Sequence, residues 1–79
     1  STEQRRISEL TVREREIIAL AAANAGATAK VIAEELSISE HTLRNHLTSI
    51  YEKLGVANRL ELYAFAHQHR LAKPRPVGR

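Results

Sequence analysis

The stretch LSISEHTLRNHLTSIYEKLG, residues 36–55, predicts an amphipathic helix with an unusual outer face. Its apolar residues are spaced four, three and four apart, which places them on one stripe of a helix: Leu43, Leu47, Ile50 and Leu54. A solvated helix face usually carries charged residues. This face instead carries mostly short groups that form directional hydrogen bonds: His41, Arg44, Asn45, His46, Thr48 and Ser49. We therefore expect a helix whose apolar stripe packs in a core and whose polar side meets a partner.

Capping residues predict two helices before this one. Thr11 and Glu14 have the spacing of a capping box, and the helix that they open is expected to end near residue 24, before Gly26. Thr28 is the expected N-cap of a short second helix to about residue 36, and Ser39 is the expected N-cap of the third. Two helices joined by so short a turn, the second longer and more polar, are typical of a helix-turn-helix.

A fourth helix is expected after the quoted stretch. The third helix should end at Gly55, and Asn58 and Glu61 have the spacing of a cap that opens a helix to about residue 69. Abundant Ala and an aromatic content of only 4% favour helices over a sheet. We therefore predict an all-α fold of four helices.

The two ends of the chain differ in composition from its middle. Residues 9–70 are expected to form one domain, because 79 residues leave no room for a second. Residues 1–8 are expected to form a flexible N-terminal linker. Residues 71–79 contain two Pro, one Gly and three basic residues, so we expect a flexible basic tail. Since the chain contains no Met, we also expect it to be one domain of a longer protein.

Residue types and spacings exclude several classes of protein. The chain has no Cys, so it forms neither a disulfide framework nor a Cys-based zinc site. His41 and His46 diverge by about 140° on one helix and His67 and His69 by about 160°, so no metal site is expected. Without Cys, Asp or a Gly-rich loop, we expect neither an enzyme nor a cofactor. No apolar run approaches the ~18 residues of a membrane span, and a cytoplasmic location is expected.

The hydrogen-bonding groups of residues 40–54 indicate the partner more clearly than the net charge of the chain does. The net charge is +3, but residues 40–54 are neutral. Arg forks onto guanine, Asn pairs with adenine, and Thr bonds to bases or phosphates. On a helical wheel Arg44, Asn45 and Thr48 lie away from the apolar stripe, so we predict that they read bases in the major groove of DNA. Groups suited to bracing a phosphate strand lie on one flank: Thr42, His46 and Lys53.

Most of the chain resembles a known family. The resemblance lies in LTVREREIIAL at residues 10–20 and in TAKVIAEELSISEHTLRNHLTSIYEKLGVANRLELYAFA at residues 28–66. These stretches are similar to the LuxR-type (GerE/FixJ-like) DNA-binding domain of bacterial transcription regulators. The resemblance implies a four-helix helix-turn-helix domain. Its third helix would be the recognition helix in the major groove of double-stranded DNA, and its fourth helix the dimer contact.

The resemblance also implies roles for individual residues. The implied base contacts are Arg44, Asn45 and Thr48. The implied phosphate contacts are Thr28, Lys30, Ser39, Thr42, His46 and Lys53. The implied contacts of a homodimer are Leu60, Tyr63, Ala64 and His67. A structural ion pair between Glu16 and Arg59 is implied as well.

The sequence therefore predicts the output domain of a bacterial transcription regulator of the response-regulator or ligand-responsive type. This domain would bind specific double-stranded DNA. One alternative is a helix-turn-helix module that acts mainly by contacting RNA polymerase. Another is a helical interaction module without nucleic acid, in which the stripe of Tyr63, Ala64 and His67 meets a protein partner.

Overall fold

The structure is a computed structural model that describes residues 1–72 of the 79-residue chain. These residues form five α-helices and no strand: α1 (Thr2–Ser8), α2 (Val12–Ala23), α3 (Ala29–Glu35), α4 (Glu40–Leu54) and α5 (Arg59–Gln68). The predicted all-α fold class is confirmed. The four predicted helices correspond to α2, α3, α4 and α5, so the predicted recognition helix is α4. Most of the predicted tail, residues 73–79, lies outside the described residues.

The helix boundaries follow the capping residues that the sequence indicated. Thr11 and Glu14 form a complete capping box: the Thr11 hydroxyl accepts from the Glu14 amide at 3.0 Å, and the Glu14 carboxylate accepts from the Thr11 amide at 2.8 Å. Each later helix also begins at its expected cap, namely Thr28, Ser39 and Asn58. Helix α4 ends at Gly55, whose φ of 71° lies in the left-handed region that glycine adopts at little cost.

The expected flexible linker at residues 1–8 is wrong, and the fold has five helices rather than four. Ser1 caps α1 by accepting from the Gln4 amide, and Ile7 is buried in the core. Arg15 donates from Nη2 to the carbonyl oxygen of Ile7 at 2.8 Å. One apolar residue in eight gives no periodic signal. The long-range contacts that hold α1 were therefore invisible in its own sequence.

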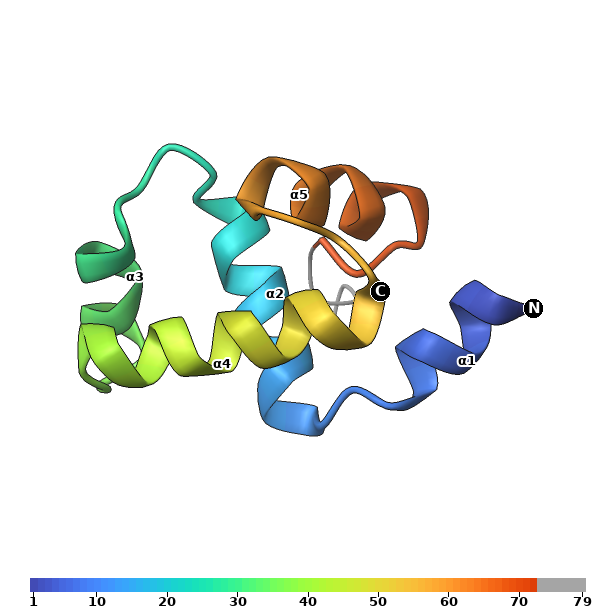
Figure 1. The fold of residues 1–79 in the computed structure, drawn as a ribbon. Helices are drawn as coiled ribbons and strands as arrows, with labels where there is room; N and C mark the ends of the chain where they lie inside the picture. The colour runs from blue at the N-terminus through green and yellow to red at the C-terminus, as the bar shows by residue number, and fades with distance from the viewer. Residues whose placement is uncertain (73–79) are drawn as a thin grey trace, which may run out of the picture.

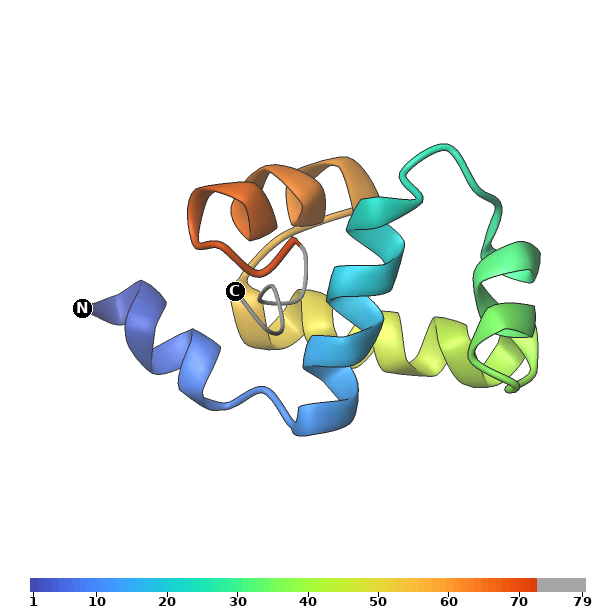
Figure 2. The ribbon, with the colours of Figure 1, turned by 180° about the vertical axis from the view of Figure 1, so that it is seen from behind.

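Helix α4 lies along one edge of the molecule, with other helices packed at its two ends (Figure 1). Helix α3 contacts α4 near its N-terminal end, and α1 contacts α4 near its C-terminal end. Helix α2 crosses behind α4 in Figure 1 and in front of it in the reverse view of Figure 2, and it packs against α5. A single cluster of buried side chains joins all five helices, and its most enclosed large members are Ile17, Ile18, Ile32, Leu43, Ile50, Leu54 and Leu62. None of the helices in residues 1–72 is long and apolar enough to span a bilayer.

Within residues 1–72, four arginines connect segments by donating to backbone carbonyl oxygens far away in the sequence. The pairs are Arg6 with Leu54 at 3.4 Å, Arg13 with Leu36 at 3.1 Å, Arg15 with Ile7 at 2.8 Å and Arg59 with Ala27 at 2.9 Å. Three of these carbonyls lie in the last turn of a helix or at its C-cap, where backbone acceptors lack partners within the helix. The arginines thus supply hydrogen-bond donors to carbonyl oxygens at helix ends and at the same time join neighbouring segments.

Candidate nucleic-acid interface

The predicted base-facing residues of α4 lie on its exposed side. Arg44, Asn45 and Thr48 are all exposed, and 65% of the Arg44 side chain is accessible to solvent. The apolar stripe on the opposite side is buried in the core. The amphipathic helix predicted from the sequence is confirmed, with Arg44, Asn45 and Thr48 on its exposed side.

Within residues 1–72, the side-chain hydrogen bonds of Arg44, Asn45 and Thr48 all go to other groups of α4. Arg44 donates from Nη2 to the Glu40 carboxylate one turn earlier, and Asn45 Nδ2 lies 3.4 Å from Nε2 of His41. The Thr48 hydroxyl donates to the carbonyl oxygen of Arg44 at 3.0 Å. Exposed pairs of this kind contribute about 0–1 kcal/mol. A ligand that offers better partners therefore displaces them at small cost.

The predicted phosphate-contact residues occupy the starts of α3 and α4 and one flank of α4. Thr28 and Ser39 are exposed N-caps, and Lys30 is exposed in the first turn of α3. The Ser39 hydroxyl accepts from the Thr42 amide at 3.0 Å and donates to the Thr42 hydroxyl at 2.9 Å. His46 is half-buried one turn after Thr42.

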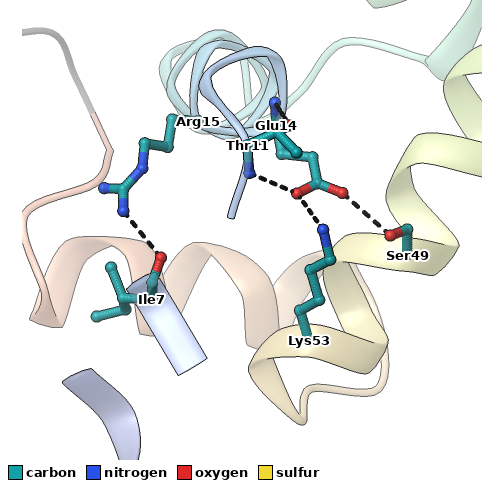
Figure 3. Close-up of polar contacts among 6 residues, drawn as sticks. All are labelled: Ile7, Thr11, Glu14, Arg15, Ser49 and Lys53. Carbon is teal, nitrogen blue, oxygen red and sulfur yellow. Dashed lines mark hydrogen bonds and ion pairs between the residues drawn. The ribbon is translucent and has the colours of Figure 1, made fainter. Parts of the chain in front are cut away.

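Lys53, the last predicted phosphate contact, points toward the protein instead of away from it. Its Nζ atom donates to Oε1 of Glu14 at 2.8 Å, and only 28% of its side chain is exposed (Figure 3). Glu14 itself is 4% exposed. The other carboxylate oxygen of Glu14 accepts from the hydroxyl of Ser49 at 3.0 Å. The charge of Lys53 is thus largely compensated inside the protein.

The Glu14 carboxylate is stabilised in its ionised form. Burial raises the pKa of a carboxyl group, but the hydrogen bonds from Lys53, Thr11 and Ser49 and the charge of Lys53 outweigh that effect. The pKa of Glu14 therefore lies below its usual value of 4.5. Sequence reasoning recognised Glu14 only as a cap. The signal that it missed is the spacing of Ser49 and Lys53, which puts two donors on one flank of α4.

The expected ion pair between Glu16 and Arg59 does not form. Glu16 pairs with Arg13 on its own helix at 3.3 Å. Arg59 donates from Nη2 to the carbonyl oxygen of Ala27 and from Nε to the hydroxyl of Tyr63 at 2.6 Å. Arg59 thus ties α5 to the loop before α3 by donating to a partly buried carbonyl oxygen, while the exposed Glu16 pairs on its own helix.

The predicted dimer-contact residues form a largely exposed stripe on α5. Leu60 is 77% exposed, and Ala64 and His67 follow it at intervals of one helical turn, also exposed. Tyr63 is half-buried and accepts the hydrogen bond from Arg59. In residues 1–72 no cluster of three or more His, Cys, Asp or Glu side chains is placed to hold a metal ion.

Most of the chain matches one known protein family. Residues 8–66 match the family described as "Bacterial regulatory proteins, luxR family". The chain belongs to the luxR family. This family consists of regulatory proteins, and the matched residues include all of α2, α3 and α4 and most of α5.

Curated relatives of this luxR-family chain are bacterial regulators. The chain is 45% identical over 65 residues to the transcriptional regulatory protein YdfI of Bacillus subtilis, covering 82% of this chain and 30% of that protein. It is 44% identical over 62 residues to LiaR of B. subtilis, covering 78% and 28%. It is 35% identical over 71 residues to the nitrate/nitrite response regulator protein NarL of Escherichia coli, covering 90% and 32%. The chain thus spans about a third or less of the length of these relatives.

Proposed function

We propose that this luxR-family chain is a DNA-binding output domain of a bacterial transcription regulator and that it recognises a specific double-stranded sequence through α4. The observation that carries the proposal is the outer face of α4, where Arg44, Asn45 and Thr48 are exposed and, as far as residues 1–72 show, hydrogen-bonded within their own helix. The relatives YdfI, LiaR and NarL, whose names describe regulatory proteins, support the same function.

The chemistry of the outer face fits base edges in a major groove. The groove is about 12 Å wide and accepts one helix. The Arg44 guanidinium has the planar fork that matches O6 and N7 of guanine, and the Asn45 amide matches N6 and N7 of adenine. The Thr48 hydroxyl already donates to a helix carbonyl, so it contributes its remaining acceptor capacity and its methyl group.

Phosphates are proposed to bind around the start of the helix-turn-helix. The hydroxyls of Thr28, Ser39 and Thr42, the ammonium of Lys30 and the imidazole of His46 are the types of group that contact a DNA backbone. Lys53 is left out of this set, because its ammonium already serves Glu14. Such contacts fix the position of the domain on the duplex without reading its sequence.

The proposed active unit is a homodimer on two-fold related half-sites. Leu60, which is 77% exposed, is an apolar side chain suited to a self-complementary contact. Leu60, Ala64 and His67 supply the outer stripe of α5 for this contact, with Tyr63 at its edge.

The decisive experiment is selection of binding sites from random duplex by the purified chain. The expected result is a short enriched motif, repeated with two-fold symmetry. The selected duplex should then bind more tightly than a shuffled duplex at one salt concentration. No enrichment with the chain alone, followed by enrichment once RNA polymerase is added, would support the module that acts mainly through polymerase.

A further inference from the structure

Glu14 is the one charged residue that the fold buries within residues 1–72. Its carboxylate joins two helices that are distant in the sequence: the capping box at the start of α2 and the C-terminal half of α4 (Figure 3). Three donors converge on its two oxygens, and all three distances lie between 2.8 and 3.0 Å. A carboxylate so fully bonded has a fixed orientation and fixes the groups that donate to it.

The two donors from α4 differ from the other polar groups of that helix. Ser49 and Lys53 lie one turn apart and point toward α2, whereas the hydrogen bonds of Arg44 and Asn45 in the described part of the chain stay within α4. Helix α4 is therefore divided into an outer face that is free to meet a ligand and an inner flank that is committed to Glu14. Lys53, the basic residue in the last turn of α4, is on the committed flank.

We propose that Glu14 is a positioning residue for DNA recognition. It fixes the C-terminal half of α4 against α2 and withholds the Lys53 ammonium from the phosphate backbone, so binding depends on the outer face of α4. This proposal rests on the proposed function. Its physical basis is that a free lysine beside DNA adds affinity for every sequence equally, whereas base contacts from the outer face of α4 add affinity only for the matching sequence and require that the helix be held in place.

The test compares Glu14→Gln with Glu16→Gln in the whole chain. Both changes remove one negative charge from the same helix. Glu16, however, is exposed, and its ion pair within residues 1–72 is with Arg13 of that helix. Glutamine at residue 14 retains acceptor and donor atoms for Thr11 and Ser49 and loses the charge that holds Lys53. For each variant, the affinity for the selected duplex and for a shuffled duplex is measured across a range of salt concentrations.

The expected result is specific to Glu14→Gln. Relative to Glu16→Gln, the slope of log K against log salt on the shuffled duplex should steepen by about 0.9, the value of one added phosphate contact. The ratio of specific to non-specific affinity should also fall, because the C-terminal half of α4 loses the ion pair that fixes it against α2 and the outer face meets the bases less precisely. Adding Lys53→Gln to Glu14→Gln should restore the slope of the Glu16→Gln variant.

Two outcomes separate this proposal from the proposed function. If the wild-type chain and Glu16→Gln prefer the selected duplex, and folded Glu14→Gln matches Glu16→Gln in slope and ratio, the positioning role is overturned. If no variant and no wild-type chain distinguishes the two duplexes, the proposed function itself fails.

A second measurement needs no variant and therefore does not depend on folding of Glu14→Gln. The chain has three lysines, so their side-chain ammonium resonances are separable by NMR. On addition of the shuffled duplex, the Lys53 resonance is expected to stay unchanged while that of the exposed Lys30 moves. A Lys53 shift as large as that of Lys30 would show that Lys53 reaches the phosphates and would overturn the proposal.

Discussion

Lys53 and Glu14 form an ion pair at 2.8 Å between α4 and the start of α2, although 39 positions separate them in the sequence. The pair is asymmetric, because the carboxylate is almost completely buried while the ammonium keeps partial contact with solvent. Breaking such a pair from the lysine side strands a buried charge, which costs more than the intact pair contributes. The position of α4 in the fold is therefore sensitive to a residue that resembles an ordinary surface cation.

Replacing Lys53 with Ala should destabilise the fold measurably. The Glu14 carboxylate would keep its bonds from Thr11 and Ser49 but lose its cation, and we expect a loss of about 1–3 kcal/mol in the free energy of unfolding. Urea denaturation followed by circular dichroism measures the loss. Lys30→Ala, at an exposed lysine of α3, is the matched control and should change stability by less than about 0.5 kcal/mol. Equal losses in both variants would contradict the account.

Stability should fall on acidification because of Glu14. Its pKa is lowered in the folded protein, so ionised Glu14 stabilises the fold above its usual pKa of 4.5, and this contribution is lost as pH falls through the lower folded pKa. The melting temperature of the wild-type chain should therefore drop below pH 4.5, and that of Glu14→Gln should drop less. Thermal melts between neutral pH and pH 3 test this, with Glu16→Gln expected to follow the wild type.

Arg44→Ala should reduce discrimination at one base position. If the guanidinium forks onto a guanine, its loss costs about 1–3 kcal/mol on the selected duplex and makes the four bases nearly equivalent there. Gel shifts with all substitutions at each position of the site give the preference profile. Lys30→Ala should instead weaken binding evenly across sequences and reduce the salt slope by about 0.9. An unchanged profile in Arg44→Ala would rule out direct reading by this residue.

Gly55→Ala should weaken the junction between α4 and α1. Gly55 has a φ of 71°, which costs a residue with a Cβ about 1–2 kcal/mol. The added Cβ would also lie 2.4 Å from Nη1 of Arg6, so Arg6 would have to move away from the carbonyl oxygen of Leu54. Chemical denaturation measures the total. In an Arg6→Ala background the cost of Gly55→Ala should shrink to the backbone part alone, and an undiminished cost would show that Arg6 plays no part.

Leu60→Glu should prevent pairing of two copies on DNA. A carboxylate that pairing would bury at residue 60, without a partner cation, is strongly disfavoured. Val12→Glu is a close control, because Val12 is 75% exposed on α2 and lies outside the stripe. Analytical ultracentrifugation with a two-half-site duplex should show two copies bound for Val12→Glu and one for Leu60→Glu. Two copies bound in both variants would place the dimer contact elsewhere.

Local signals in the sequence predicted the helices α2 to α5 but not every contact between them. The caps Thr11, Thr28, Ser39 and Asn58 act through neighbouring amides, and the apolar stripe of α4 follows from helical period, so both are readable locally. Helix α1 was missed because it is held by contacts with other parts of the chain. The Ile7 side chain packs in the core, and Arg15 donates to the carbonyl oxygen of Ile7.

The candidate site was predicted where it depends on one helix and missed where it depends on two. Exposure of Arg44, Asn45 and Thr48 follows from their places around α4. The pairing of Lys53 with Glu14 cannot be predicted from one helix, because only the packing of α2 against α4 brings the two side chains together. The failed pairing of Glu16 with Arg59 has the same origin, because the resemblance indicated a pair while the packing offered Arg59 a backbone oxygen.

The arginines that bond to distant carbonyl oxygens also explain why this chain has nine Arg and only three Lys. A guanidinium offers several donors in a rigid plane, and Arg13 and Arg59 each use them for two partners at once. Part of the arginine content of this protein therefore serves to hold the helices together, and the number of arginines overstates how many are available to bind DNA phosphates. Exchanging Arg6, Arg13, Arg15 and Arg59 for lysine would leave the isoelectric character almost unaltered and still loosen the joints between helices.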